Sequence, residues 1–271
     1  MRPRQWVKNA FVLAPLLFAS RFTEGAAVVQ ALLAMALFCV ASSAVYIVND
    51  WRDIEHDRLH PVKRHARPLA AGTVSTSAAA MLLLGCGVVL AFGTLVQPRV
   101  MGVIALYVVI NLAYSFWLRH VPVVDIFTIA SGFVLRVYAG AVALAVPVSS
   151  WMFVTTLCLA LYLAAIKRRQ ELRSTGSVAR EVLQKYSPAL IDRYAEMSAT
   201  GALVFYSLFV MTAHTELIVT IPLVLFGLFR YWYVVEQTEG GESPADVLLT
   251  DVPLLLAVLV WLGLCAWRLW T

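Results

Sequence analysis

Residues 27–48 read AVVQALLAMALFCVASSAVYIV and contain no charged side chain. A helix of about 20 apolar residues is long enough to cross the hydrocarbon core of a bilayer, so this run predicts a transmembrane span. The residues that follow, 49–57, read NDWRDIEHD and are strongly charged. An apolar span that ends in clustered acids indicates a membrane protein whose chemistry lies at one membrane surface.

The composition of the whole chain supports a polytopic membrane protein. Of its 271 residues, 61% are hydrophobic and 14% are charged, whereas soluble domains average about 45–50% apolar and about 25% charged residues. This excludes an ordinary soluble domain and the disordered, collagen-like and nucleic-acid-binding classes. The four cysteines lie inside apolar stretches without CxxC spacing, so neither a disulfide framework nor a zinc site is indicated.

Nine apolar segments predict an all-α bundle of about nine transmembrane helices, which forms a single domain over residues 1–271. Two segments, 6–20 and 197–213, are short, and we include them because only then are the charges consistently distributed. The basic N-terminus also resembles the start of a signal peptide, but Trp6 and Pro15 interrupt its apolar run. The seven longer segments are 27–48, 77–96, 100–118, 123–145, 149–166, 216–235 and 252–270.

Lys and Arg are distributed unevenly between the two membrane faces. With nine spans, nearly all of the 21 Lys and Arg residues fall on the side of the N-terminus. The exceptions are Arg21, Arg99 and Arg268 on the other side and Arg136 inside a span. The positive-inside rule therefore predicts a multi-pass protein of the cell (inner) membrane with its N-terminus and long polar loops in the cytoplasm.

Three aspartates end the second predicted span on one helix face. Asp50 and Asp57 lie about 20° apart on an α-helix, and Asp53 lies within about 60° of Asp50. Like charges this close repel one another unless a cation lies among them, and Mg²⁺ prefers hard oxygen ligands completed by substrate phosphate. We therefore expect these aspartates to be catalytic groups and Mg²⁺ ligands. The alternative is a solvated helix end whose aspartates pair with Arg52, Arg58 or Lys63.

A basic loop follows the aspartates directly. Residues 57–72 contain two prolines and several cations, among them Lys63, Arg64 and Arg67. Adjacent acids and bases are typical of a site that binds a bridging anion, with metal on one side of a diphosphate and Lys or Arg on the other. The alternative is a surface patch that binds anionic lipid. The two interpretations are compatible if the phosphate of a lipid is itself a substrate.

Polar groups also lie at the ends of two other spans. Tyr114 and Arg119 close the fourth span, and Lys167 and Glu171 form an i,i+4 pair beyond the sixth. The pair is suited to holding phosphate and either a second metal or a sugar hydroxyl, but a basic cluster after a span is also ordinary for a cytoplasmic loop. The acidic loop at 236–251 either completes a metal site or is a cap without a chemical role.

Arg136 is the one basic residue predicted to lie inside a span. It falls on the same helix face as Asp125, about 16 Å away along the axis. An arginine at this depth is costly, so it should face a polar cavity or a partner. Contact with substrate and pairing with an aspartate or a carbonyl are both open.

The pattern Asn49-Asp50-x-x-Asp53-x-x-x-Asp57 after the second of nine spans resembles the UbiA superfamily of intramembrane prenyltransferases. Four stretches are similar to its decaprenyl-phosphate phosphoribosyltransferase branch, in the same order along the chain. They are residues 2–9 (RPRQWVKN), residues 57–68 (DRLHPVKRHARP), Ser131-Gly132-Phe133 with Arg136, and residues 167–172 (KRRQEL). The resemblance covers the whole chain.

The resemblance implies a bundle with a cytoplasm-facing polar cavity and an Mg²⁺-dependent reaction. In that reaction, 5-phosphoribosyl passes from 5-phosphoribosyl 1-diphosphate to a polyprenyl phosphate, such as decaprenyl phosphate, and diphosphate is released. The product is a lipid-linked pentose for cell-envelope synthesis. Expected partners are the two substrates and the bilayer, with no nucleic acid, and a homo-oligomer is left open. The implied substrate-binding residues are Lys8, Asn49, Lys63, Arg64, Arg67, Tyr114, Arg119, Arg136, Lys167 and Glu171.

Two other functions are weighed against this one. A UbiA-type prenyltransferase that joins an isoprenyl diphosphate to an aromatic or quinone precursor uses the same aspartates. It should carry a second aspartate pair within 167–196, where this chain has basic residues and Glu171 instead. In a transporter or lipid-binding protein, ionisable groups are expected along several spans, whereas here they gather at one face.

His65-Ala66 departs from the family pattern, which leaves open whether Arg64 or Arg67 binds phosphate.

Overall fold

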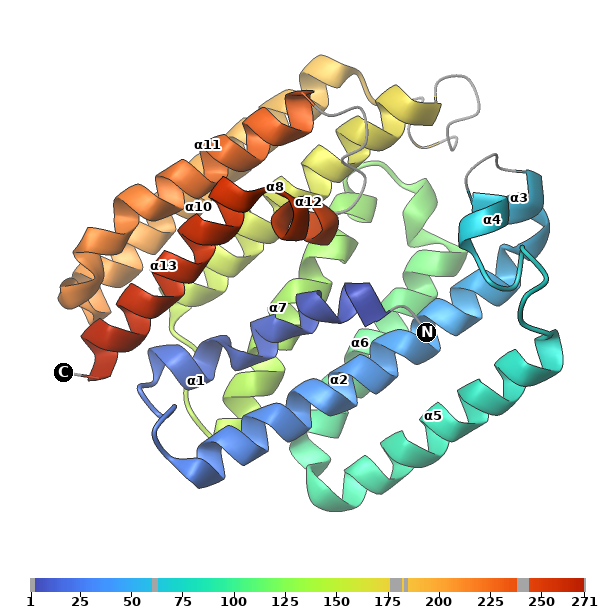
Figure 1. Ribbon diagram of the computed structural model, residues 1–271, viewed down its shortest axis with the longest axis horizontal. Coiled ribbons are helices and arrows are strands. Elements are labelled where there is room, and N and C mark those ends of the chain that lie inside the picture. Colours follow the sequence, from blue (N-terminus) through green and yellow to red (C-terminus); the bar gives the residue numbers. More distant parts are fainter. Residues whose placement is uncertain (1–2, 60–62, 176–181, 183–184, 238–243, 271) are drawn as a thin grey trace.

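The computed structural model describes residues 3–59, 63–175, 182, 185–237 and 244–270 (Figure 1). These residues form helices and connecting turns, and none of them lies in a strand. The long helices are α2 (Gly25–Arg52), α5 (Thr76–Val96), α6 (Pro98–Phe116), α7 (Val124–Leu144), α8 (Ser150–Thr175), α10 (Pro188–Ala213), α11 (Ile221–Gln237) and α13 (Val252–Trp270). The short ones are η1 (Pro3–Leu13), α1 (Ala14–Phe18), α3 (Ile54–Leu59), α4 (Lys63–Ala66), η2 (Leu118–His120), η4 (Thr215–Thr220) and α12 (Pro244–Thr250).

Eight helical segments of the described chain are long and apolar enough to cross a membrane. They correspond to eight of the nine expected spans, with η4 and α11 together forming one of them. The all-α, multi-pass architecture is therefore confirmed. Their outer surfaces carry many exposed large apolar side chains, as expected for helices that face lipid.

The first expected span, 6–20, has a different structure. It forms a 3-10 helix of 11 residues, η1, followed by the five-residue α1. Pro15 at the start of α1 has no N–H and its ring clashes with the carbonyl four residues earlier, so one regular α-helix cannot continue through this point. The count of nine is thus not confirmed. Because a 3-10 helix rises more steeply, the segment still extends over about 30 Å, the thickness of the hydrocarbon core.

The N-terminal segment packs against α2 and α7. The Trp6 indole donates a hydrogen bond to Ser43 Oγ over 3.1 Å. The backbone of η1 at Val12 contacts the backbone of α7 at Gly140. A Cβ at Gly140 would lie 1.9 Å from the carbonyl oxygen of Val12. Only glycine leaves room for this crossing, so Gly140 sets the position of η1.

The two ends of the bundle differ in polarity. At one end, Arg119 contacts Asp53 and Arg168 contacts Asp125, which joins the end of α6 to α2 and α8 to α7. The opposite end has fewer charges, and there Arg21 donates to the carbonyl of Leu144 over 2.8 Å. Figure 1 shows the two ends of α2, with α3 and α4 beside one of them and the turn from α1 at the other.

Candidate active site at the polar end of the bundle

Asp50 in the last turn of α2 and Asp57 in α3 converge on a single cation, so the aspartates do not share one continuous helix as the sequence predicts. Nη1 of Arg67 contacts Asp50 Oδ1 directly and lies 4.0 Å from Asp57 Oδ2. Both aspartates are buried, with 8% and 4% of their surface exposed. Arg67 thus occupies the position between two carboxylates where the sequence predicts a cation.

Asp53 faces a different set of partners. It is the C-cap of α2, and its carboxylate lies 3.0 Å from Arg52 and 3.3 Å from Arg119. Within the described part of the chain, no three His, Cys, Asp or Glu side chains gather as a metal site. The structure therefore brings together two of the three expected ligands, and the third pairs with arginines, one of them the expected alternative partner Arg52. Two converging carboxylates still suit Mg²⁺, which often binds one or two carboxylates plus substrate phosphates.

Arg67, not Arg64, is the basic-loop residue next to the aspartates. Arg64 is exposed and donates to the ring of His65 over 2.8 Å. Lys63 begins α4, but its side chain lies outside the described residues. Of the two arginines considered, Arg67, which follows His65-Ala66, is therefore the one that lies against Asp50.

Asn49 and Arg52 attach the end of α2 to the end of α6. The Ser115 hydroxyl donates to Asn49 Oδ1, and Arg52 donates to the Ser115 carbonyl. These contacts fix the direction in which the neighbouring aspartates leave α2. Ser115 was not selected from the sequence, because a serine near the end of a span has no distinctive pattern.

A second polar cluster lies where α6, α7 and α8 meet. Arg168 is 1% exposed, and its Nε donates to Asp125 Oδ2 over 2.7 Å. The same guanidinium also donates to Glu171 and to the Tyr114 hydroxyl. Asp125 is 0% exposed, so this ion pair is fully desolvated, and Arg168 positions both Tyr114 and Glu171. From the sequence, Asp125 was expected only as a partner for Arg136, and Arg168 had no role of its own.

Tyr186 connects this cluster to the loop before α7. Its hydroxyl donates to Asp125 Oδ1 over 2.8 Å and accepts the backbone N–H of Val123. Val123 has φ 69°, in the left-handed region that a β-branched residue rarely adopts. Burial raises the pKa of Tyr186, so the hydroxyl keeps the proton that it donates. The loop is thus held in a strained conformation beside the polar end of the bundle.

The expected pair of Lys167 and Glu171 is present on α8. Lys167 Nζ lies 3.7 Å from Glu171 Oε1. Since Glu171 also contacts Arg168, it lies between two cations. Tyr114, Lys167 and Glu171 therefore belong to one cluster, and Arg119 lies with the aspartates.

Arg136 is held by groups of the protein. Its Nε donates to Asn9 Oδ1 over 2.7 Å, and Nη1 donates to the Gly132 carbonyl over 2.6 Å. Its guanidinium also lies 4.9 Å from the ring centre of Tyr107. Of the two partners expected for Arg136, the carbonyl is found and Asp125 is not. Lys8, beside Asn9 in η1, is half-buried.

An apolar cavity of about 150 Å³ lies inside the bundle. It is lined from six helical elements, η1, α1, α8, α10, α11 and α13, and the lining side chains are almost all aromatic or aliphatic. They include Phe11, Phe18, Met152, Phe209, Val224 and Trp261. The cavity is therefore suited to a hydrocarbon group. None of the described aspartates lines this cavity. The polar, cytoplasm-facing cavity that the sequence predicts therefore stays a prediction.

A family model described as the UbiA prenyltransferase family matches residues 10–250 of the chain. The chain belongs to the UbiA prenyltransferase family. It is therefore a multi-pass membrane transferase.

Relatives and solved structures agree with this family. Decaprenyl-phosphate phosphoribosyltransferase of Corynebacterium glutamicum is 34% identical, over 96% of this chain and 82% of the relative. The protein of the same name from Mycobacterium tuberculosis is 35% identical, over 97% of this chain and 90% of the relative. A UbiA homolog from Archaeoglobus fulgidus bound to GPP and Mg²⁺ has a similar fold, with a TM-score of 0.67 at 20% identity, covering 100% of this chain and 98% of that one.

Proposed function

We propose that this UbiA family member transfers 5-phosphoribosyl from 5-phosphoribosyl 1-diphosphate to a polyprenyl phosphate, such as decaprenyl phosphate, and releases diphosphate. The observation that carries the proposal is the mixture of charges at the polar end. Arg67 lies between Asp50 and Asp57, and a second basic cluster stands at Lys167 and Arg168. A donor with both a diphosphate and a 5-phosphate needs more cations than an isoprenyl diphosphate does. The relatives that are 34% and 35% identical bear the name of this reaction.

The reaction breaks the bond between C1 of the ribose and the diphosphate oxygen, and it forms a bond from C1 to an oxygen of the lipid phosphate. Negative charge grows on the departing diphosphate, where Arg67 stabilises it. The lipid phosphate is already an anion, so the acceptor requires no strong base. Lys63, Arg64, Arg119 and Lys167 complete the phosphate-binding groups in this proposal, Tyr114 and Glu171 line the substrate pocket, and Asn49 supports the aspartates.

Asp50, Asp57 and Asp53 are the residues that would hold Mg²⁺ together with the diphosphate. When bound, the ion supplies positive charge against the leaving group. With Asp50 and Asp57 engaged by the ion, Arg67 would be free to bind the phosphates of the donor, since its contacts in the structure are with these two carboxylates.

The lipid substrate reaches the site from the bilayer. An isoprenoid chain enters sideways between helices because its transfer to water is unfavourable. The apolar cavity beside Phe18 and Trp261 offers a place for part of this chain. In the proposed orientation the N-terminus and the polar end face the cytoplasm of the cell membrane, where the soluble donor is available, and the lipid-linked pentose serves cell-envelope synthesis.

The test is transfer of label by the purified protein. The protein in detergent is given Mg²⁺, radiolabelled 5-phosphoribosyl 1-diphosphate and a panel of polyprenyl phosphates, and label in the organic phase is counted. We expect transfer by the wild type and a loss of at least about 100-fold in Asp50→Ala. Glu55→Gln is the matched control, since Glu55 is an exposed carboxylate in the same segment. Absence of label in lipid for every polyprenyl phosphate would contradict the proposal.

A further inference from the structure

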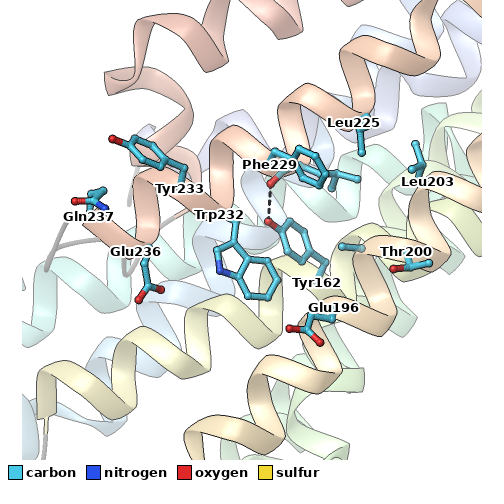
Figure 2. Close-up of a pocket in the computed structure, with 12 residues that line it drawn as sticks. Tyr162, Glu196, Thr200, Leu203, Leu225, Phe229, Trp232, Tyr233, Glu236 and Gln237 are labelled. Atoms are coloured by element: carbon cyan, nitrogen blue, oxygen red, sulfur yellow. Dashed lines mark hydrogen bonds between the residues drawn. The ribbon is translucent and has the colours of Figure 1, made fainter.

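A groove of about 530 Å³ runs between α10 and α11, apart from the site described above (Figure 2). Tyr162 of α8 forms its floor, and the Tyr162 hydroxyl donates to the Leu228 carbonyl over 3.0 Å. Because that hydroxyl is satisfied within the protein, the floor presents mainly the ring of Tyr162. The groove is thus a fixed feature of the packing between α8, α10 and α11.

The groove has the length and polarity of one bilayer leaflet. On α11 it extends from Leu225 to Gln237, about 18 Å along the helix axis, and one leaflet contributes about 15 Å of hydrocarbon. Its deep end is lined by Leu203, Leu225 and Phe229, and its other end carries Glu196 and Gln237. This gradient fits a single amphiphile with its chain inward and its headgroup at the polar end.

The groove opens toward the membrane. Phe229 is 68% exposed and Tyr233 is 55% exposed, and both line the groove on a membrane-spanning helix. An aromatic side chain facing outward at this depth has lipid as its natural neighbour. Water is therefore not the expected occupant of the deep end.

The charges at the polar end favour a cationic headgroup. The negative charge of Glu236 is balanced within the protein, since its carboxylate forms ion pairs with both Arg169 and Arg173. Glu196 is exposed and makes no ion pair with any residue that the structure describes. Glu196 of α10 and Trp232 of α11 both line this groove (Figure 2). A carboxylate and the face of an aromatic ring each attract an ammonium group, and the carboxylate repels an anionic headgroup.

We propose that this groove binds one molecule of phosphatidylethanolamine, with its ammonium at Glu196 and Trp232 and an acyl chain along Leu203 and Phe229. A primary ammonium donates charge-assisted hydrogen bonds to a carboxylate, whereas a choline headgroup has no N–H to donate. The site is separate from the aspartates and does not depend on the proposed transfer reaction.

Native mass spectrometry of the full-length protein tests this proposal. The protein is released from nanodiscs that contain equal amounts of phosphatidylethanolamine and phosphatidylglycerol, and the retained lipids are identified. We expect the wild type to retain one phosphatidylethanolamine, and Glu196→Gln to lower its ratio to phosphatidylglycerol by about fivefold. Glu216→Gln, which removes a carboxylate from η4 at the opposite end of the bundle, should leave the ratio unchanged.

A second variant tests the groove itself. Ala199→Trp places a large ring into the lining and should abolish retention of the lipid, while thermal unfolding in detergent shows that both variants are folded. Equal retention of the two lipids by the wild type, or an unchanged ratio in Glu196→Gln, would overturn the proposal. A second copy of the chain retained in place of lipid, and lost with Ala199→Trp, would also overturn it.

Discussion

Ion pairs at the polar end of the bundle differ greatly in burial, and their contributions should differ accordingly. Arg168 and Asp125 have 1% and 0% of their side chains exposed. Removing one member leaves an unpaired buried charge, which typically costs about 3–5 kcal/mol. We therefore expect Asp125→Leu and Arg168→Met each to lower the free energy of unfolding by that amount, and the double variant to recover part of it.

The less buried pair of Arg230 and Asp251 provides the comparison. Their side chains are 29% and 11% exposed, so this pair is less desolvated than Arg168 and Asp125, and Arg230→Met should lower stability less than Arg168→Met does. Thermal and denaturant unfolding in one detergent measure all the variants. Similar losses of unfolding free energy for Arg168→Met and Arg230→Met would contradict the larger contribution expected from the buried pair of Arg168 and Asp125.

Arg67 should compete with a divalent cation for Asp50 and Asp57. Its guanidinium contacts both carboxylates, so its removal should tighten binding of Mn²⁺, a spectroscopic probe for Mg²⁺. One elementary charge at about 4 Å in water corresponds to about 1 kcal/mol, or roughly fivefold in affinity. The Mn²⁺ affinity of Arg67→Met is measured from the electron paramagnetic resonance signal of free Mn²⁺, so the test does not depend on transferase activity.

Two matched variants decide this prediction. Arg64→Met removes an exposed arginine three residues away and should leave Mn²⁺ affinity unchanged, whereas Asp50→Asn should abolish tight binding. Weaker Mn²⁺ binding by Arg67→Met would mean that Arg67 supports the metal site instead of competing for it.

The sequence predicts that Asp50 and Asp57 lie close together, and they do, although on two helices, α2 and α3, instead of on one face of a single helix. The break at Asp53, where α2 ends, could not be read, and it directs Asp53 toward Arg119. The contacts of Arg168 depend on the packing of α6, α7 and α8. A local pattern carries no information about such packing, although a buried aspartate at the start of a span signals that a partner must exist.

At the scale of elements, the N-terminal segment is positioned by its close approach to α7. Gly140→Ala would place a Cβ 1.9 Å from the Val12 carbonyl oxygen, so η1 must shift. We expect a loss of about 1–3 kcal/mol in the free energy of unfolding. Gly263→Ala in α13 is the control, because its Cβ would meet nothing within 4 Å. A stability of Gly140→Ala equal to that of the control would contradict the described crossing.

The helices also show what hydropathy can and cannot predict. The expected spans 149–166 and 197–213 end or begin well inside α8 and α10. Both helices continue into polar sequence, where Ser187 caps α10 by accepting the N–H of Leu190 and Lys167 pairs with Glu171 on α8. Hydropathy detects the part of a helix that lies in lipid, whereas caps and i,i+4 pairs determine where the helix ends.

At the scale of the whole molecule, the proposed topology requires the N-terminal segment to cross the membrane. Single cysteines at Arg64 and Glu24, in a chain whose native cysteines are replaced, report the two sides. In intact cells a membrane-impermeant maleimide should label Glu24→Cys and spare Arg64→Cys, since the two positions lie at opposite ends of α2. An N-terminal tag should be protected from added protease. Accessibility of both the tag and Glu24→Cys would show that η1 and α1 do not cross.

The central claim concerns the donor, and one competition measures it most directly. The purified protein receives Mg²⁺, 5-phosphoribosyl 1-diphosphate and an isoprenyl diphosphate together, with a polyprenyl phosphate and an aromatic acceptor, and the lipid extract is analysed by mass spectrometry. The account predicts a polyprenyl phosphate that has gained a phosphoribosyl group, and an unchanged aromatic acceptor. A prenylated aromatic product with unmodified polyprenyl phosphate would contradict it and show that the basic clusters serve an ordinary prenyltransferase.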